Sequence, residues 1–110
     1  MNLKNKNYYT YINNKTTPIV FIHGVGLDRN MWTPQINFFR KYSTLTYDLL
    51  GHGKTPFNED KIKIEDYTHQ LISLIEDLKI SKLHLVGFSI GSLIAMDFAA
   101  NFNNKLSSLT

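Results

Sequence analysis

Residues 83–91 read LHLVGFSIG, and they carry the strongest signal for the fold of the 110-residue chain. Residues 83–86 form a short apolar run, which predicts a buried strand. From residue 90 to residue 102 apolar side chains recur at helical spacing, which predicts a helix. Between them, residues 87–91 match the pattern G-x-S-x-G, in which a serine lies on a sharp turn from a strand into a helix. The stretch therefore predicts a strand–turn–helix unit with Ser89 at the turn.

The chemistry expected of Ser89 follows from this turn. So sharp a turn forces the serine into a strained backbone conformation, and side chains at Gly87 and Gly91 would crowd each other, so glycine is needed at both. The serine would also lie at a helix N-terminus, where free N–H groups and the helix dipole favour negative charge. We therefore predict that Ser89 is a catalytic nucleophile. The pattern alone also occurs as an ordinary glycine-rich loop, and the flanking strand and helix favour the catalytic interpretation.

Two strands upstream of Ser89 also end in glycine-bearing loops. Ile19–Ile22 is apolar at successive positions, as in a parallel strand covered on both faces, and it runs into His-Gly-Val-Gly at residues 23–26. Leu45–Leu49 predicts another strand, which Gly-His-Gly at residues 51–53 closes. Tyr8–Ile12 favours a further strand. Because ligands bind beyond the carboxyl ends of the strands in open α/β sheets, we expect the glycine-bearing loops to form the site.

Two more helices are predicted between these strands. A short one begins near residue 33, with Thr33 as its cap and Pro34 at its first position. Ile64–Leu78 carries a single apolar stripe and is the clearest helix of the sequence. Its other residues are expected to point towards water: Glu65, Asp66, Gln70, Ser73, Glu76 and Asp77. Strands that alternate with helices predict an α/β fold with a mostly parallel sheet and helices on both faces.

Acyl transfer through a serine needs backbone donors aimed at the developing oxyanion. Where a serine lies on such a turn, one donor follows the nucleophile and the other comes from the loop after an earlier strand. The candidates are the N–H groups of Ile90 and Val25, and Gly24 and Gly26 would let the loop approach a substrate closely. The same loop also fits an ordinary glycine turn that joins a strand to a helix.

Three stretches together resemble the N-terminal landmarks of the α/β-hydrolase superfamily. They are PIVFIHG at residues 18–24, YDLLGHGKT at residues 47–55 and VGFSIG at residues 86–91. Their order and separation also match, and the resemblance runs from about residue 17 to residue 110, which is nearly the whole chain. GLDRNMWTPQ at residues 26–35 is further similar to the enol-lactonase and small-ester esterase branch. A serine at the turn, rather than an aspartate, argues against the dehalogenase and epoxide hydrolase branches.

The resemblance implies a serine hydrolase that needs neither a metal nor a cofactor. It implies roles in shaping the loops, rather than as general base, for His23 and His52. Leu27, Trp32 and Phe88 are candidates to line the acyl pocket, and each of them fits a core position equally well.

The order of the triad in the family is serine, then aspartate or glutamate, then histidine. Beyond Ser89 the sequence has one acidic residue, Asp97, and no histidine, so the triad acid and histidine are not present in this chain. Asp97 is expected to be an exposed helix residue that cannot reach back over the serine. Of the earlier histidines, His69 is expected beside the polar face of its helix and His84 is expected to be hydrogen-bonded inside a strand.

We therefore expect a single, truncated α/β-hydrolase domain over residues 1–110, which lacks the later strands and the lid. Residues 106–110 read as the start of another strand. On this expectation the strand at residues 83–86 would be an exposed sheet edge, which invites aggregation.

Composition excludes several other classes of protein. The net charge is +3 and the pI about 9.2, but the lysines and arginines are scattered and no nucleic-acid-binding module is present, so we predict no nucleic-acid partner. The absence of cysteine excludes disulfides, thiolate zinc sites and a cysteine nucleophile. No run approaches the roughly 20 apolar residues that cross a bilayer, and residues 1–9 contain no apolar core of a signal peptide. We predict a cytoplasmic protein without a membrane partner.

Two hypotheses about function remain. The first is a hydrolase of a small carboxylic ester or lactone that works through an acyl-serine intermediate. The second is an inactive binding or interaction module, since loss of the histidine base lowers kcat by about 10⁶ in comparable triads. The same turn also serves hydrolysis of carbon–carbon bonds and cofactor-free oxidation, and the oligomeric state is open.

Overall fold

The structure, a computed structural model, describes residues 7–57 and 62–110. The N-terminal residues 1–6, which entered the argument against a signal peptide, lie outside the described residues. The strands are β1 (Tyr9–Ile12), β2 (Ile19–Ile22), β3 (Thr44–Tyr47), β4 (Leu83–Gly87) and β5 (Leu106–Leu109). The helices are α1 (Thr33–Phe38), α2 (Ile64–Asp77) and α3 (Ile90–Phe102), with short 3-10 helices η2 (Arg29–Trp32) and η3 (Asn103–Lys105).

These strands form one sheet in the order β1-β3-β2-β4-β5. Neighbouring strands from β3 to β5 run parallel, and β1 pairs with β3 in the antiparallel direction. A parallel sheet requires crossover connections, and the helices between the strands supply them. The prediction of an α/β fold with a mostly parallel sheet is therefore confirmed.

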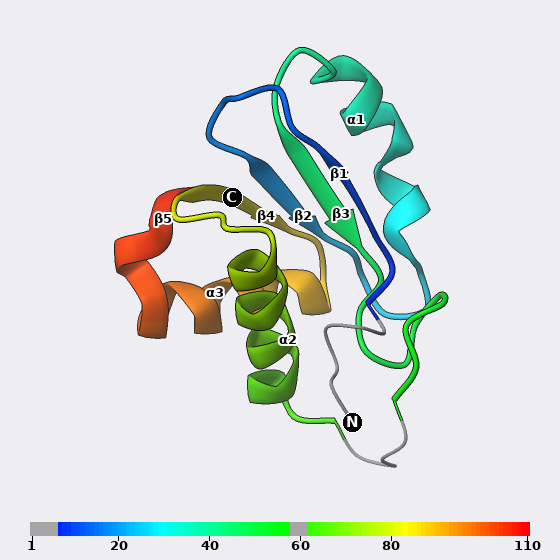
Figure 1. Cartoon of the computed structure of the whole chain (residues 1–110). Coiled ribbons are helices and arrows are strands. Elements are labelled where there is room, and N and C mark those ends of the chain that lie inside the picture. The colour runs from blue at the N-terminus through cyan, green and yellow to red at the C-terminus, as the bar shows by residue number, and fades with distance from the viewer. Residues whose placement is uncertain (1–6, 58–61) are drawn as a thin grey trace.

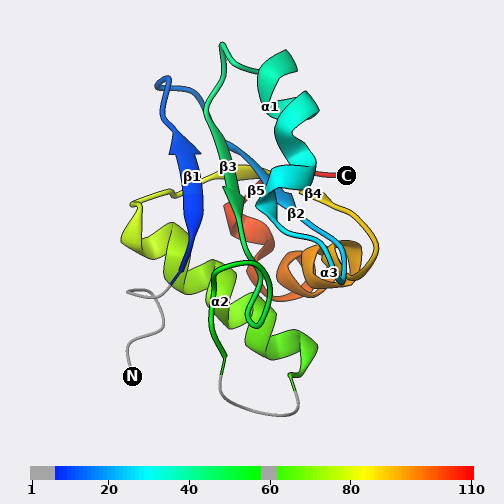
Figure 2. The same ribbon diagram turned by 90° about the vertical axis from the view of Figure 1, so that its right-hand side faces the viewer.

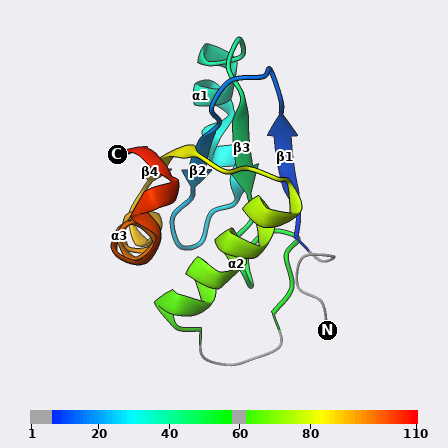
Figure 3. The ribbon, with the colours of Figure 1, turned by 60° about the vertical axis from the view of Figure 1, so that its left-hand side comes forward.

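Helices cover both faces of this sheet. Figure 1 shows α1 on one side of the strands and α2 and α3 on the other, and the quarter turn in Figure 2 brings α1 in front of the sheet. Figure 3 shows α2 and α3 side by side below the strands. The core lies between this helix pair and the central strands, where fully buried side chains meet. They include Val20, Ile22, Leu45, Leu85, Leu71, Leu74, Ile75, Ile94 and Phe98.

The predicted sheet edge at residues 83–86 is wrong. β4 lies between β2 and β5 and pairs with both, so the outer strand on this side is β5. The start of a strand predicted at residues 106–110 is confirmed, and it is this segment that covers the apolar β4. The edge that β5 presents is mostly exposed and carries Ser107 and Ser108, which suit an outer strand better than the apolar residues of β4 do.

The region around the short helix differs from the prediction. Thr33 is not the cap of α1: the N-cap is Trp32, which makes no side-chain cap hydrogen bond. The side-chain cap of this region belongs to η2, where the Asp28 carboxylate accepts a hydrogen bond from the Asn30 N–H at 2.8 Å. Thr33 is already helical and its hydroxyl donates to the Asn30 carbonyl at 2.9 Å. Pro34 stands in the first turn of α1, where the missing N–H costs nothing.

Two polar helix residues were predicted to face water, but they bind other parts of the protein instead. Gln70 on α2 is 1 % exposed and binds the backbone after β3. Asp97 on α3 is half-buried, and it accepts a hydrogen bond of 2.6 Å from the hydroxyl of Thr68 on α2. Sequence periodicity identifies the apolar stripe of a helix, but it cannot recognise a polar residue whose hydrogen-bond partner lies on another element.

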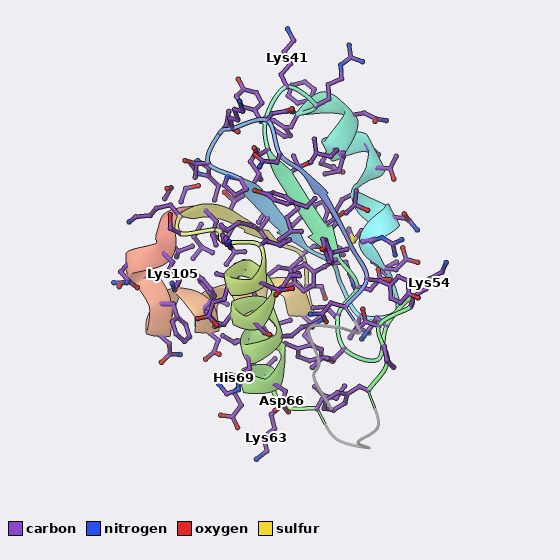
Figure 4. All side chains as sticks on the ribbon, viewed as in Figure 1. Lys41, Lys54, Lys63, Asp66, His69 and Lys105 are labelled. Carbon is purple, nitrogen blue, oxygen red and sulfur yellow. The ribbon has the colours of Figure 1, made fainter. Side chains whose placement is uncertain are left out.

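Charged side chains are spread around the periphery, as the scattered lysines predicted. Figure 4 shows the labelled lysines pointing outwards from separate parts of the fold: Lys41, Lys54, Lys63 and Lys105. His69 is exposed near the start of α2, where the sequence pattern placed it. Within residues 7–57 and 62–110, no helix combines the length and the apolar character needed to cross a bilayer.

Candidate functional site

The predicted strand–turn–helix unit forms at Ser89. The backbone of Ser89 has φ 59° and ψ −121°, outside the regions that residues with a side chain favour, so the strained conformation expected of this turn is present. Ser89 is exposed and directly precedes the first helical residue of α3. The turn closes through the Gly91 N–H, which donates to the Phe88 carbonyl at 2.9 Å, and the Ser92 N–H, which donates to the Ser89 carbonyl at 2.8 Å.

The two glycines that flank Ser89 are required by crowding. A side chain on Gly87 would overlap the backbone of Gly91 and Ser92. A side chain on Gly91 would overlap the carbonyl groups of Ile22 and His23, which belong to the end of β2 and the loop that follows it. The crowding predicted between Gly87 and Gly91 is confirmed. Gly91 also lets α3 pack closely against the end of β2.

The loop after β2 packs directly against this turn. Ile22 and Gly87 are register partners in the parallel pair β2–β4, and the Phe88 N–H donates to the Ile22 carbonyl at 3.1 Å. Gly24 lies so close that a Cβ atom there would be 2.9 Å from the Phe88 ring and 3.4 Å from the Ser89 Cβ. The backbone that carries Val25 therefore passes beside the serine, as the paired loops of the sequence suggested.

The two N–H groups predicted as oxyanion donors are available. Within the described residues, neither the Val25 N–H nor the Ile90 N–H donates a hydrogen bond to a protein acceptor. Val25 is 63 % exposed, and Gly26 beside it adopts φ 77°, a conformation that glycine tolerates and other residues resist. The two N–H groups belong to the two loops that meet at Ser89, and donors without a protein acceptor remain free to bind a developing negative charge.

His23 cannot act as the general base. Its Nε2 accepts a hydrogen bond from the Leu49 N–H at 3.0 Å, so the proton of the neutral ring is on Nδ1, which donates to the Gly24 carbonyl at 2.8 Å. Both ring nitrogens are thus occupied by backbone groups, and the side chain is fully buried. Burial lowers the pKa of His23 below 6.5. The hydrogen bond to the Gly24 carbonyl acts in the opposite direction and raises the pKa, but its effect is smaller. The role of His23 in shaping the loop is consistent with these contacts.

This buried histidine should make stability depend on pH. Because the pKa of His23 is lowered in the folded state, the unfolded state binds more protons as the pH falls below 6.5. The stability that neutral His23 contributes is therefore complete above pH 6.5 and is lost as the pH falls towards its folded pKa. We expect the urea midpoint of the wild type to drop more steeply between pH 7 and pH 5 than that of His23→Gln, which has no group to titrate there. Parallel curves for the two proteins would contradict this expectation.

The other histidines also lie in structural positions. The Nδ1 atom of His52 is 3.0 Å from the Leu50 carbonyl, and its ring lies 5.2 Å from that of His23, centre to centre. His84 on β4 forms a hydrogen bond of 2.7 Å with the hydroxyl of Ser108 on β5, which confirms the hydrogen-bonded strand residue that was expected. Within the described residues, no three histidine or acidic side chains are grouped so that they could hold a metal ion.

The three candidates for the acyl pocket differ in their surroundings. Leu27 is 42 % exposed and Phe88 is 51 % exposed, so both can contact a ligand near the serine. Trp32 is 7 % exposed and packs on Phe21, with ring centres 4.9 Å apart. Its indole N–H finds no hydrogen-bond acceptor within the described part of the chain.

A cavity of about 520 Å³ lies away from Ser89. Its walls come from β2, β4 and β5, from the residues just before β2 and from the segment that follows α1. Its lining residues are Thr16, Thr17, Ile19, Phe21, Phe39, Tyr42, His84, Val86 and Ser108. Neither Ser89 nor the loop at residues 24–27 contributes to it, so it has no part in the arrangement described above.

Sequence patterns missed two residues near the site. Asp48 is fully buried at the end of β3 and forms a salt bridge of 2.8 Å with Arg29. Gln70 donates to the Asp48 carbonyl at 3.0 Å and accepts from the Leu50 N–H at 3.1 Å. Asp48 lies in YDLLGHGKT at residues 47–55, one of the three stretches that carry the family resemblance. Its place in that stretch is the sequence signal that could have identified it.

Comparison with known proteins agrees with this geometry. Residues 17–110 match a family described as alpha/beta hydrolase fold. Over 78 residues the chain is 37% identical to (E)-2-((N-methylformamido)methylene)succinate hydrolase from Acinetobacter baylyi, a match that covers 70% of this chain and 30% of that protein.

Solved structures show the same similarity. The enol-lactonase from Burkholderia xenovorans LB400 superposes with a TM-score of 0.89 at 27% identity, over 94% of this chain and 41% of that chain. A thermophilic esterase from Thermogutta terrifontis superposes with a TM-score of 0.88 at 26% identity, over 94% of this chain and 38% of that chain. The chain thus spans between 30% and 41% of the length of these relatives.

Proposed function

Because the chain belongs to the alpha/beta hydrolase fold family, we propose that it is the N-terminal part of a serine hydrolase that cleaves a small carboxylic ester or lactone. The observation that carries the proposal is the strained, exposed backbone of Ser89 at the start of α3, flanked by two free N–H groups. A protein maintains such strain where the rest of the structure holds it in place, and it occurs preferentially at active sites.

In the proposed reaction, the Ser89 hydroxyl oxygen attacks the carbonyl carbon and its proton passes to a general base. The electron pair of the C=O bond moves to the oxygen, which accepts hydrogen bonds from the Val25 and Ile90 N–H groups. The tetrahedral intermediate then collapses, the C–O bond of the ester breaks, and the leaving alcohol takes the proton from the base. Water attacks the acyl-serine by the same steps in reverse and releases the carboxylic acid.

We place the general base and its acidic partner outside the 110 residues. Support comes from the occupied ring of His23 and from the share of its relatives, 30% to 41% of their length, that this chain spans. The position of Asp97, bonded to Thr68 between α2 and α3, also argues against a role in the triad. On this proposal residues 1–110 form a single part of one hydrolase domain.

The proposed substrate class rests on the named relatives and on the pocket candidates. One similar structure is called an enol-lactonase and another an esterase, and both names describe attack on a carboxylic ester bond. The exposed Leu27 and Phe88 are proposed to contact the acyl group, and the buried Trp32, which packs on Phe21, remains a further candidate. Hydrolysis of a carbon–carbon bond uses the same nucleophile, and a β-diketone substrate offered beside esters and lactones distinguishes the two reactions.

The proposal predicts covalent labelling of Ser89 in the complete gene product. Diisopropyl fluorophosphate should form a bond from the serine oxygen to phosphorus, with loss of fluoride, because an activated serine attacks the reagent as it attacks an ester. Mass spectrometry of the digested protein should find the added group on the peptide that contains residues 87–91. Ser73→Ala, on α2, should be labelled as fast as the wild type, and Ser89→Ala should not be labelled.

Absence of labelling in the folded, complete gene product would contradict the proposal. It would favour the inactive binding module instead, for which no base is needed. Labelling of a serine other than Ser89 would show a hydrolase with a different nucleophile.

A further inference from the structure

Asp48 is a buried charge that contacts Arg29, at the end of the loop that carries Val25. Its carboxylate is fully buried and accepts three hydrogen bonds. The Arg29 N–H donates to Oδ1 at 2.8 Å, the Arg29 guanidinium donates to Oδ2 at 2.8 Å, and the Lys54 N–H donates to Oδ2 at 2.9 Å. A buried carboxylate with an ionic partner and several donors is held in one orientation, because any rotation leaves a charge or an N–H group unpaired.

The residue after Asp48 holds the other end of the same loop. The Leu49 N–H donates to Nε2 of His23, and His23 immediately precedes Gly24. Asp48 and Leu49 thus bind the residues on both sides of the segment 24–28. We call this pair of attachments, at His23 and at Arg29, the β3 clamp.

The β3 clamp is itself fixed to α2. Gln70 donates to the Asp48 carbonyl at 3.0 Å and accepts from the Leu50 N–H at 3.1 Å, so the chain cannot shift along the end of β3 without breaking buried hydrogen bonds. The clamp is therefore a rigid support that reaches from the helix layer to the loop beside Ser89.

The loop itself has little internal support. Within segment 24–28, the backbone hydrogen bond is the one that the Leu27 N–H donates to the Gly24 carbonyl at 3.2 Å, and Gly26 adopts φ 77° in open space. A short glycine-bearing loop of this kind takes its position from its two ends. The direction of the Val25 N–H should therefore depend on the attachments at His23 and Arg29.

We propose that Asp48 is a positioning residue for the oxyanion donor: through Arg29 it holds the loop at the place where the Val25 N–H meets the reacting oxygen. This inference rests on the proposed function, since it assigns a role within the same site. Displacement of an oxyanion donor lowers the rate because the hydrogen bond is formed to the transition state, not to the substrate.

The test is Asp48→Asn in the complete gene product, since asparagine keeps the shape and one acceptor oxygen but cannot accept all three hydrogen bonds. We expect kcat for p-nitrophenyl acetate to fall about 10- to 100-fold, less than the roughly 10²- to 10³-fold loss of a whole donor. KM should change by less than about twofold, because the ground-state contacts remain. Asp97→Asn is the matched control, because it makes the same substitution at a half-buried carboxylate that binds the Thr68 hydroxyl and lies outside the β3 clamp, and its kcat should equal that of the wild type.

Phenylboronic acid separates a positioning role from a structural one. The reagent forms a tetrahedral adduct with Ser89 whose oxygen occupies the oxyanion site, so its inhibition constant should rise by the same factor by which kcat/KM falls. A purely structural role would lower the number of active sites, counted by burst titration, and leave kcat per site and the boronate inhibition constant unchanged. That result would overturn the inference.

If Asp48→Asn does not fold, a second variant tests the same inference. Arg29→Gln removes the guanidinium, whose side chain is 21% exposed, and keeps the Arg29 N–H bond to Oδ1. It should raise the boronate inhibition constant in proportion to its loss of kcat/KM, and an unchanged boronate inhibition constant would overturn the inference. Failure of the proposed function is distinguishable, since in that case Ser89→Ala would retain the hydrolytic activity of the wild type.

Discussion

Ser89→Ala is expected to lower kcat for ester or lactone hydrolysis by about 10⁶ in the complete gene product. The hydroxyl forms the covalent intermediate, and no other exposed serine of the described residues lies on a strained turn with free N–H donors on both sides. The residual rate should exceed that in water by about 10³ to 10⁴, because the oxyanion donors remain in place. Steady-state kinetics with p-nitrophenyl acetate and with an enol lactone measure the loss.

The control for this prediction must preserve the fold. Ser73→Ala on the partly buried side of α2 changes the same functional group far from the turn, and it should keep the kcat of the wild type. Circular dichroism and the urea midpoint should agree for all three proteins, since neither variant removes a fully buried group and the loss of one hydroxyl outside the core costs little stability. A Ser89→Ala enzyme with more than a tenth of the wild-type kcat would disprove the assignment of Ser89 as nucleophile.

Gly91→Ala is expected to destabilise the protein by more than about 3 kcal/mol. The added methyl group would overlap the backbone carbonyls of Ile22 and His23, and backbone atoms of a central strand cannot move aside as a flexible side chain can. The helix α3 would have to withdraw from β2, which would also disturb the turn at Ser89. Urea unfolding of the purified variant measures the change, and insoluble expression would be the extreme form of the same result.

Gly26→Ala provides the comparison for Gly91→Ala. Gly26 adopts φ 77° with no atom within 4 Å of the position of a Cβ, so alanine there suffers only the backbone strain of about 1–2 kcal/mol. Gly91 has an ordinary φ, and its requirement for glycine comes from contact alone. Equal losses for the two variants would show that crowding against β2 is not what fixes the glycine at position 91.

Local sequence signals predicted most of the chain correctly. The strands at residues 19–22 and 83–86 and the helices at residues 64–78 and 90–102 were found within one residue of their observed ends. Each contains an apolar run or stripe. The spacing of its apolar residues shows which side of the strand or helix is buried, so the element can be recognised from its own residues. The strand predicted at Leu45–Leu49 is observed at Thr44–Tyr47, and Asp48, the residue after it, forms a salt bridge with Arg29.

Predictions failed where a residue serves a distant partner. Gln70 and Asp97 look like solvent-facing helix residues, but Gln70 binds the Asp48 carbonyl, 22 residues away in sequence, and Asp97 binds the Thr68 hydroxyl, 29 residues away. The edge strand was also misjudged, since β5 was recognised as a strand but not as the neighbour of β4. Which strands become neighbours depends on how the helix between them packs on the sheet. The residues of the strands alone do not reveal that packing.

The α/β class, the order of strands and helices along the chain, and the turn at Ser89 with its two glycines all follow from local sequence patterns. These features depend on neighbours within a few residues, where spacing and side-chain size act directly. Three other features are visible only in the folded molecule: Leu49 fixes His23, Asp48 joins the loops after β2 and β3, and β5 covers β4. The physical reason is that a buried polar group must find a hydrogen-bond partner wherever the chain brings one, and for these residues the partner comes from another strand or loop.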